Sequence, residues 1–184
     1  FLPVVFFLYW FVFQNKLQRQ NLFVVAASYF FYGWWDWRFL SLIVFSTGVD
    51  FIIGRLLIKT DSRIKRRALL FSSIFINLGF LGVFKYYDFF LENFVTAFSL
   101  LGTELEANRL NIILPVGISF YTFQTLSYTI DIYRGTRKPE THFGIFALYV
   151  SFFPQLVAGP IERSTRLLPQ FFQKHTFDAG RAVS

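Results

Sequence analysis

The chain has 184 residues, of which 54% are hydrophobic and 22% aromatic, and its formal net charge is +7. This apolar content exceeds what a soluble domain of this size needs to fill one core, which argues against a water-soluble domain. The basic residues lie between apolar runs and form no stripe with interleaved aromatics, so no nucleic-acid partner is expected. Cysteine is absent, which excludes disulfides, thiol nucleophiles and Cys-ligated metals in this chain.

Apolar runs divide the chain into five candidate membrane spans. A helix crosses roughly 30 Å of hydrocarbon with about 20 residues, and lipid cannot satisfy free backbone amides, so each span must be helical. The first run is followed by basic residues and lacks a cleavage site, which favours a truncated span over a signal peptide. The sequence therefore predicts one all-α domain over residues 1–184, a polytopic transmembrane bundle with runs at 1–13, 21–35, 39–58, 68–84 and 112–130.

The connector between the third and fourth runs predicts the orientation. From Arg55 to Arg67 it holds six basic residues and one acidic residue, and the positive-inside rule places such a loop in the cytoplasm. Counting spans from this loop puts the tryptophan-rich residues 34–37 and the acidic residues 104–106 outside. The same count returns further basic residues to the cytoplasm, namely Lys16, Arg19, Arg134, Arg137 and Lys138.

The last apolar stretch, residues 142–161, does not fit a continuous span. Pro154, Gly159 and Pro160 interrupt it and would leave backbone groups unpaired. Such backbone survives at membrane depth only when it is buried in protein or lines a cavity. We therefore expect a broken or re-entrant element over 142–161.

Three polar residues, Asp50, Asn77 and Gln124, lie near the middle of three different runs. A charge at the bilayer centre costs on the order of 2.5 to 3.5 kcal/mol on insertion scales, so Asp50 should face protein or water. Because the three depths are similar, the side chains are expected to meet. Two roles stay open, a hydrogen-bonded cluster between helices and a part of a substrate path.

A polar stripe runs along the fifth run. Five residues recur at helical spacing and so share one face: Gly117, Tyr121, Gln124, Tyr128 and Asp131. Such a stripe indicates the wall of a wet tunnel or a packed polar interface. The two histidines, His142 and His175, lie apart from any metal-ligand spacing, and no phosphate loop or nucleophile elbow is present. No bound cofactor, metal or catalytic residue is predicted within the chain.

Four motifs carry a family resemblance. They are Ala-Ser-Tyr-Phe-Phe-Tyr-Gly-Trp-Trp at 27–35, Phe-Lys-Tyr-Tyr at 84–87, Leu-Pro-Val-Gly-Ile-Ser-Phe-Tyr-Thr-Phe-Gln at 114–124 and Phe-Phe-Pro-Gln-Leu-Val-Ala-Gly-Pro-Ile at 152–161. In this order they resemble the N-terminal half of the membrane-bound O-acyltransferase family, in the branch that acetylates alginate and similar bacterial polysaccharides.

The resemblance implies the N-terminal part of a longer, multi-pass enzyme of the bacterial inner membrane. Such an enzyme passes an acyl group, preferably acetyl, from a cytoplasmic thioester donor such as acetyl-CoA to hydroxyls of an extracytoplasmic polysaccharide. Expected partners are the lipid bilayer, the donor, the polysaccharide acceptor and other polysaccharide-acetylation proteins. The family's essential histidine comes from its C-terminal half and is expected downstream of residue 184, so this chain alone should be inactive.

The resemblance also implies a tunnel through the membrane between the helices. Six residues are candidates to line it: Asp50, Tyr121, Gln124, Tyr128, Gln155 and Arg163. Gln155 and Arg163 are expected near the cytoplasmic mouth, where Arg163 could favour an anionic donor or simply hold the membrane interface. Two other functions stay open, a transporter or export subunit and a structural partner of a polysaccharide-synthesis complex. No internal repeat is visible in the sequence, which counts against the transporter.

Overall fold

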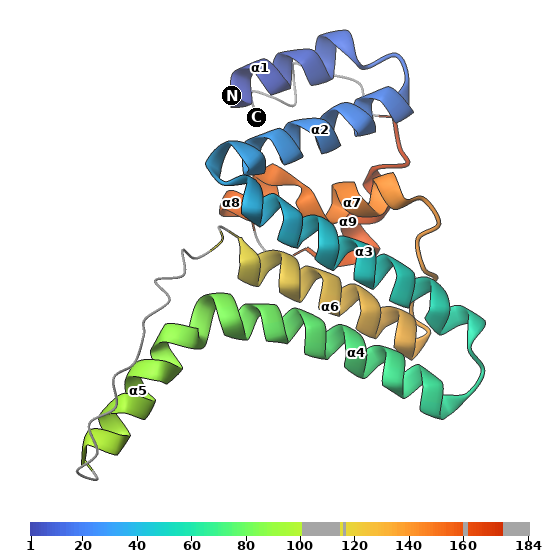
Figure 1. Cartoon of the computed structure of the whole chain (residues 1–184). Coiled ribbons are helices and arrows are strands. Elements are labelled where there is room, and N and C mark those ends of the chain that lie inside the picture. Colours follow the sequence, from blue (N-terminus) through green and yellow to red (C-terminus); the bar gives the residue numbers. More distant parts are fainter. Residues whose placement is uncertain (101–114, 116, 160–161, 175–184) are drawn as a thin grey trace.

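The computed structural model describes residues 1–100, 115, 117–159 and 162–174, and every regular element in these ranges is helical. This confirms the predicted all-α class. The elements, shown in Figure 1, are α1 (Leu2–Phe7), η1 (Leu8–Val12), α2 (Leu17–Trp35), α3 (Trp37–Lys59), α4 (Arg63–Leu81), η2 (Gly82–Tyr86), α5 (Tyr87–Leu100), α6 (Ile118–Arg134), α7 (Phe143–Ser151), α8 (Phe153–Ala158) and α9 (Ser164–Gln170).

Helices α2, α3, α6 and α4 follow one another across the bundle, with α7 packed against α2 and α3 (Figure 1). The turn from α2 to α3 is a single extended residue, Asp36, at φ −159°. Its carboxylate accepts a hydrogen bond from the Arg38 N–H at 2.8 Å. An N-cap of this kind satisfies a backbone donor that the new helix leaves unpaired, so α3 begins one residue after α2 ends.

Arg66, in the first turn of α4, joins three helices at one end of the bundle. Its guanidinium donates to the carbonyls of Leu57 and Tyr133, each at 2.8 Å. These carbonyls belong to the last turns of α3 and α6, which carry unpaired acceptors and the negative end of the helix dipole. The basic connector after α3 and the basic end of α6, which the charge rule assigns to one side, therefore lie together (Figure 1).

The fourth helix is longer than predicted. The run expected to end at residue 84 continues from α4 through the π-helical η2 into α5, which projects from the bundle (Figure 1). In the described part of the chain, α3 and the stretch Arg63–Ser99 are long and apolar enough to cross a membrane. Large side chains such as Phe71, Phe75 and Phe90 are exposed along this stretch. An apolar surface of this kind needs lipid or further protein to cover it.

The predicted break in 142–161 is present. Helix α7 ends at Ser151, Phe152 leaves the helical conformation, and α8 begins at Phe153. Pro154 lies in the first turn of α8, where the missing N–H costs nothing because it has no helical partner. Helix α7 is buried along its length from Phe146 onward, so this broken element lies inside the protein.

Candidate functional site

Helix α6 is the centre of the candidate site, and both of its ends are set by glycine. Gly117 precedes the helix at φ +76° and Gly135 follows it at φ +77°, the left-handed region in which a side chain is disfavoured. At the C-terminal end, the Gly135 N–H donates to the Ile132 carbonyl at 3.0 Å. One side of α6 faces α3 and α4, and the other faces α7.

Asp50 is the centre of a buried hydrogen-bonded group on the first side of α6. Its Oδ2 accepts from the Asn77 side-chain amide at 2.8 Å, and its Oδ1 accepts from the Ser73 hydroxyl and from the Thr129 hydroxyl at 3.3 Å. The Asn77 Oδ1 in turn accepts from two further hydroxyls. We call this group the Asp50 cluster: Ser46, Asp50, Ser73, Asn77, Thr125 and Thr129.

The Asp50 cluster is closed on itself. Each of the six residues is at most 1% exposed. The donors to the carboxylate in the described part of the chain are hydroxyls and an amide. A buried carboxylate needs such donors, because burial removes its hydration. The prediction that Asp50 and Asn77 meet is confirmed, and the contacts indicate that they hold α3, α4 and α6 together.

The prediction that Gln124 joins them is wrong. Its amide donates to the Tyr149 carbonyl at 2.6 Å and lies 3.5 Å from the Gln155 Oε1, on the side of α6 that faces α7. The physical reason is angular, because adjacent residues on a helix point about 100° apart. Thr125 and Thr129, four residues apart and on one face, reach the cluster in its place. The position of Gln124 along α6 was predicted well, but the direction in which its side chain points around the helix was not.

Tyr128 holds the connection between α6 and α7. It is fully buried, its ring centroid lies 4.5 Å from that of Phe146, and its hydroxyl accepts from the Glu140 N–H at 2.8 Å. The Glu140 carboxylate accepts from the backbone N–H groups of Thr141 and His142 at 2.8 and 3.1 Å. An acidic group is favourable there, because it lies at the positive end of the α7 dipole. These contacts give Tyr128 a packing role.

Tyr32 was missed as a candidate. It belongs to the first family motif, but a tyrosine in an aromatic run is typical of core packing, and only the structure shows where its hydroxyl lies. That hydroxyl is buried and has no hydrogen-bond partner among the described residues. It lies 3.1 Å from where a Cβ on Gly117 would be. Tyr121, one turn into α6 and 3% exposed, belongs to the same core.

The other two candidates lie apart from each other. Gln155, on α8, is buried beside Gln124, whereas Arg163 is exposed where α9 begins. It is Arg137, half-buried, whose guanidinium donates to the Ser164 carbonyl at the start of α9. The structure thus brings Gln124 and Gln155 together and places Asp50 in a separate cluster. His142 is exposed at the start of α7, and His175 lies outside the described residues.

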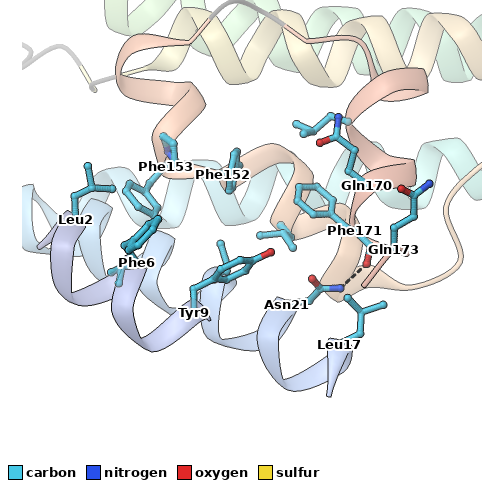
Figure 2. A pocket seen from close by; sticks show the side chains of 15 residues that line it. Leu2, Phe6, Tyr9, Leu17, Asn21, Phe152, Phe153, Gln170, Phe171 and Gln173 are labelled. Atoms are coloured by element: carbon cyan, nitrogen blue, oxygen red, sulfur yellow. Dashed lines mark hydrogen bonds between the residues drawn. The ribbon is translucent and has the colours of Figure 1, made fainter. Parts of the chain in front are cut away.

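A cavity of about 290 Å³ lies elsewhere, between α1, α2, α7, α8 and α9. Figure 2 shows its aromatic walls, with Phe6 and Phe153 on facing elements. None of the six candidate residues is among the described residues that line it. This cavity and the polar groups around α6 are therefore two distinct features.

Curated relatives match nearly the whole chain. It is 40% identical to a probable alginate O-acetylase of Pseudomonas aeruginosa over 97% of the chain and 34% of that protein. It is 36% identical to the probable alginate O-acetylase of Pseudomonas syringae pv. tomato, over 97% of the chain and 34% of that protein. It is also 34% identical to a peptidoglycan O-acetyltransferase of Helicobacter pylori, over 95% of the chain and 37% of that protein.

These O-acetylases are members of the membrane-bound O-acyltransferase family, and the chain is similar to them over nearly its whole length. Similarity to members of this family implies a membrane protein, and the two long apolar helices found among the described residues agree with this. The chain spans about a third of the length of the relatives it matches. No family model matches it, and no solved structure matches it significantly.

Proposed function

We propose that this chain is the membrane-embedded N-terminal portion of an O-acetyltransferase. In this proposal a multi-pass bundle in the bacterial inner membrane takes acetyl from a cytoplasmic thioester donor, for which acetyl-CoA is the candidate. It delivers the acetyl group to hydroxyls of an extracytoplasmic polysaccharide. The observation that carries the proposal is the similarity to named O-acetylases over 95% to 97% of the chain.

Alginate is the proposed acceptor, because alginate O-acetylases are the most frequent relatives among those matched. The relative named for peptidoglycan makes a second acceptor a specific alternative. Both acceptors are polysaccharides outside the cytoplasmic membrane. The basic ends of α3 and α6, joined by Arg66, would then face the cytoplasm under the positive-inside rule.

Within the bundle, the side of α6 that faces α7, together with Tyr32 of α2 and Gln155 of α8, is the proposed substrate path. Here the Tyr32 hydroxyl, which has no hydrogen-bond partner among the described residues, lies with Tyr121, Gln124 and Gln155. A buried hydroxyl without a partner costs roughly 1 to 3 kcal/mol, and a water or a substrate hydroxyl would remove that cost. The Asp50 cluster is satisfied without a ligand, so its proposed role is to fix the helices that form the path.

The general base is proposed to come from the remainder of the polypeptide. His142 is exposed at the start of α7, apart from Tyr32 and Gln155 on α2 and α8. Replacing it should therefore spare the reaction. By analogy with general-base catalysis, the missing group would take the proton of the attacking acceptor hydroxyl.

The full-length protein should restore acetyl esters in a bacterium from which the resident O-acetylase has been deleted. The measurement is the acetyl content of purified alginate and of purified peptidoglycan, compared between cells with and without the protein. The His142→Ala variant is the matched control and should retain most of the activity. If neither polymer gains acetyl esters while the protein is present in the membrane, the proposed function is wrong.

A further inference from the structure

The cavity beside α1 has one apolar end and one polar end. Figure 2 shows Leu2, Phe6 and Phe153 grouped at the apolar end. At the other end lie the side-chain amides of Asn21, Gln170 and Gln173, and Asn21 donates to the Phe171 carbonyl at 2.7 Å (Figure 2). The long axis of the cavity therefore runs from hydrocarbon-like walls to hydrogen-bonding groups.

The polar end also carries positive charge. Lys16 precedes Leu17 at the start of α2, and Lys174 follows Gln173, and both lysines are exposed. The start of α2 has no side-chain cap, so its first backbone N–H groups add the positive end of the helix dipole. The helices that form the cavity contain no acidic residue in their described ranges. Among the described charged side chains near this end, an anionic group would thus meet the two lysines.

The apolar end is open to the surroundings of the protein. Leu2 and Phe6 line the cavity and are 60% and 47% exposed, while Val24 and Leu148 close its inner wall. In a membrane protein, the medium that meets exposed Leu and Phe side chains is lipid hydrocarbon. A chain from the bilayer can thus reach the cavity sideways.

We propose that this cavity binds an anionic phospholipid, with one fatty acyl chain against Phe6, Phe152 and Phe153 and the phosphate near Lys16 and Lys174. The cavity volume of about 290 Å³ is at the lower end of small-molecule sites, which suits one section of an acyl chain. The site is separate from the path around Tyr32, and the inference rests on the membrane location of the chain, not on the acetyl-transfer proposal.

The test is photolabelling of the full-length protein in vesicles that contain phosphatidylglycerol with a diazirine on its acyl chain. Labels mapped by peptide mass spectrometry should concentrate on residues 2–9 and 152–154. Unlabelled phosphatidylglycerol should compete better than phosphatidylcholine. The double variant Lys16→Gln with Lys174→Gln should reduce that preference by roughly fivefold or more, because each basic residue near the surface favours anionic lipid.

A matched pair on α2 separates the cavity from general lipid contact. Val24→Phe fills the inner wall of the cavity, whereas Leu22→Phe changes a residue that is 69% exposed on the same helix. Labelling of 152–154 should fall several-fold in the first variant and stay unchanged in the second. Uniform labelling of all exposed apolar residues, equal competition by the two lipids, or labelling insensitive to Val24→Phe would each overturn the proposal. Absence of label from 2–9 and 152–154, as expected if further protein fills the cavity, would overturn it as well.

Discussion

The two sides of α6 bury polar groups in different ways. On the side facing α3 and α4, the Asp50 carboxylate and the Asn77 amide find their partners within the cluster. On the side facing α7, next to α2 and α8, the Tyr32 hydroxyl has no partner among the described residues. A closed network contributes to the stability of the bundle, while a buried group without a partner is available to a water or a ligand. The comparison therefore separates residues that hold the helices from residues that can meet substrate.

The largest expected effect on stability concerns the side of α6 that carries the Asp50 cluster. Asp50→Leu removes the acceptor of three donors and should lower the free energy of unfolding by about 3 kcal/mol. Asp50→Asn should cost less than about 1 kcal/mol, because the Ser73 and Thr129 hydroxyls can turn and accept from the new amide while its oxygen still faces Asn77. Thermal unfolding of the full-length protein in detergent checks both values. Equal loss in the two variants would mean that the negative charge, and not the hydrogen bonding, holds the cluster.

The next effect concerns the close approach at the start of α6. Gly117→Ala forces a side chain into a left-handed conformation and brings its Cβ to 3.1 Å from the Tyr32 hydroxyl. The matched control is Gly135→Ala, which has nearly the same φ but open space around it. We expect Gly135→Ala to lower the free energy of unfolding by about 1 to 2 kcal/mol. Gly117→Ala should lower it by about 1 kcal/mol more. Equal losses, measured by thermal unfolding, would show that Tyr32 does not pack against Gly117.

A smaller effect, the coupling energy in a double-mutant cycle, distinguishes hydrogen-bond partners of Asp50 from residues that only lie at the same depth. The double-mutant cycle of Asp50→Leu with Asn77→Leu should give a coupling of about 0.6 to 1.7 kcal/mol, the range found for hydrogen bonds between membrane helices. The matching cycle of Asp50→Leu with Gln124→Leu should be additive within about 0.5 kcal/mol, because the Gln124 amide donates to the Tyr149 carbonyl on α7. Coupling in the second cycle and additivity in the first would reverse our assignment of the two sides.

Much of the fold followed from the sequence, for reasons that differ between elements. The length of α3 was predicted within two residues at either end, because apolar composition and flanking charge mark it directly. The break at Phe152 was expected from Pro154. The extension of the fourth helix through η2 into α5 was not, because the polar residues Lys85 and Asp88 signal a membrane boundary without interrupting the helix.

The site was harder to predict than the helices. Asp50 and Asn77 meet because both lie at mid-depth, but the choice of Thr125 and Thr129 over Gln124 depends on how α6 is rotated. Helical spacing shows which residues share a face, not which neighbour that face meets. Tyr32 carried no signal beyond its motif, because an unpartnered hydroxyl is a property of packing. Such groups are found only once the structure is known.

The most direct test is the rate of acetyl transfer by two variants of the full-length protein, each normalised to folded protein in the membrane. Tyr32→Phe removes a hydroxyl that no described residue bonds, so it should leave thermal stability unchanged or higher and lower the rate roughly three- to tenfold. Asp50→Asn should retain the rate of the parent protein. A full rate in Tyr32→Phe, or a folded Asp50→Asn protein without activity, would contradict the assignment of the substrate path to the α7 side of α6.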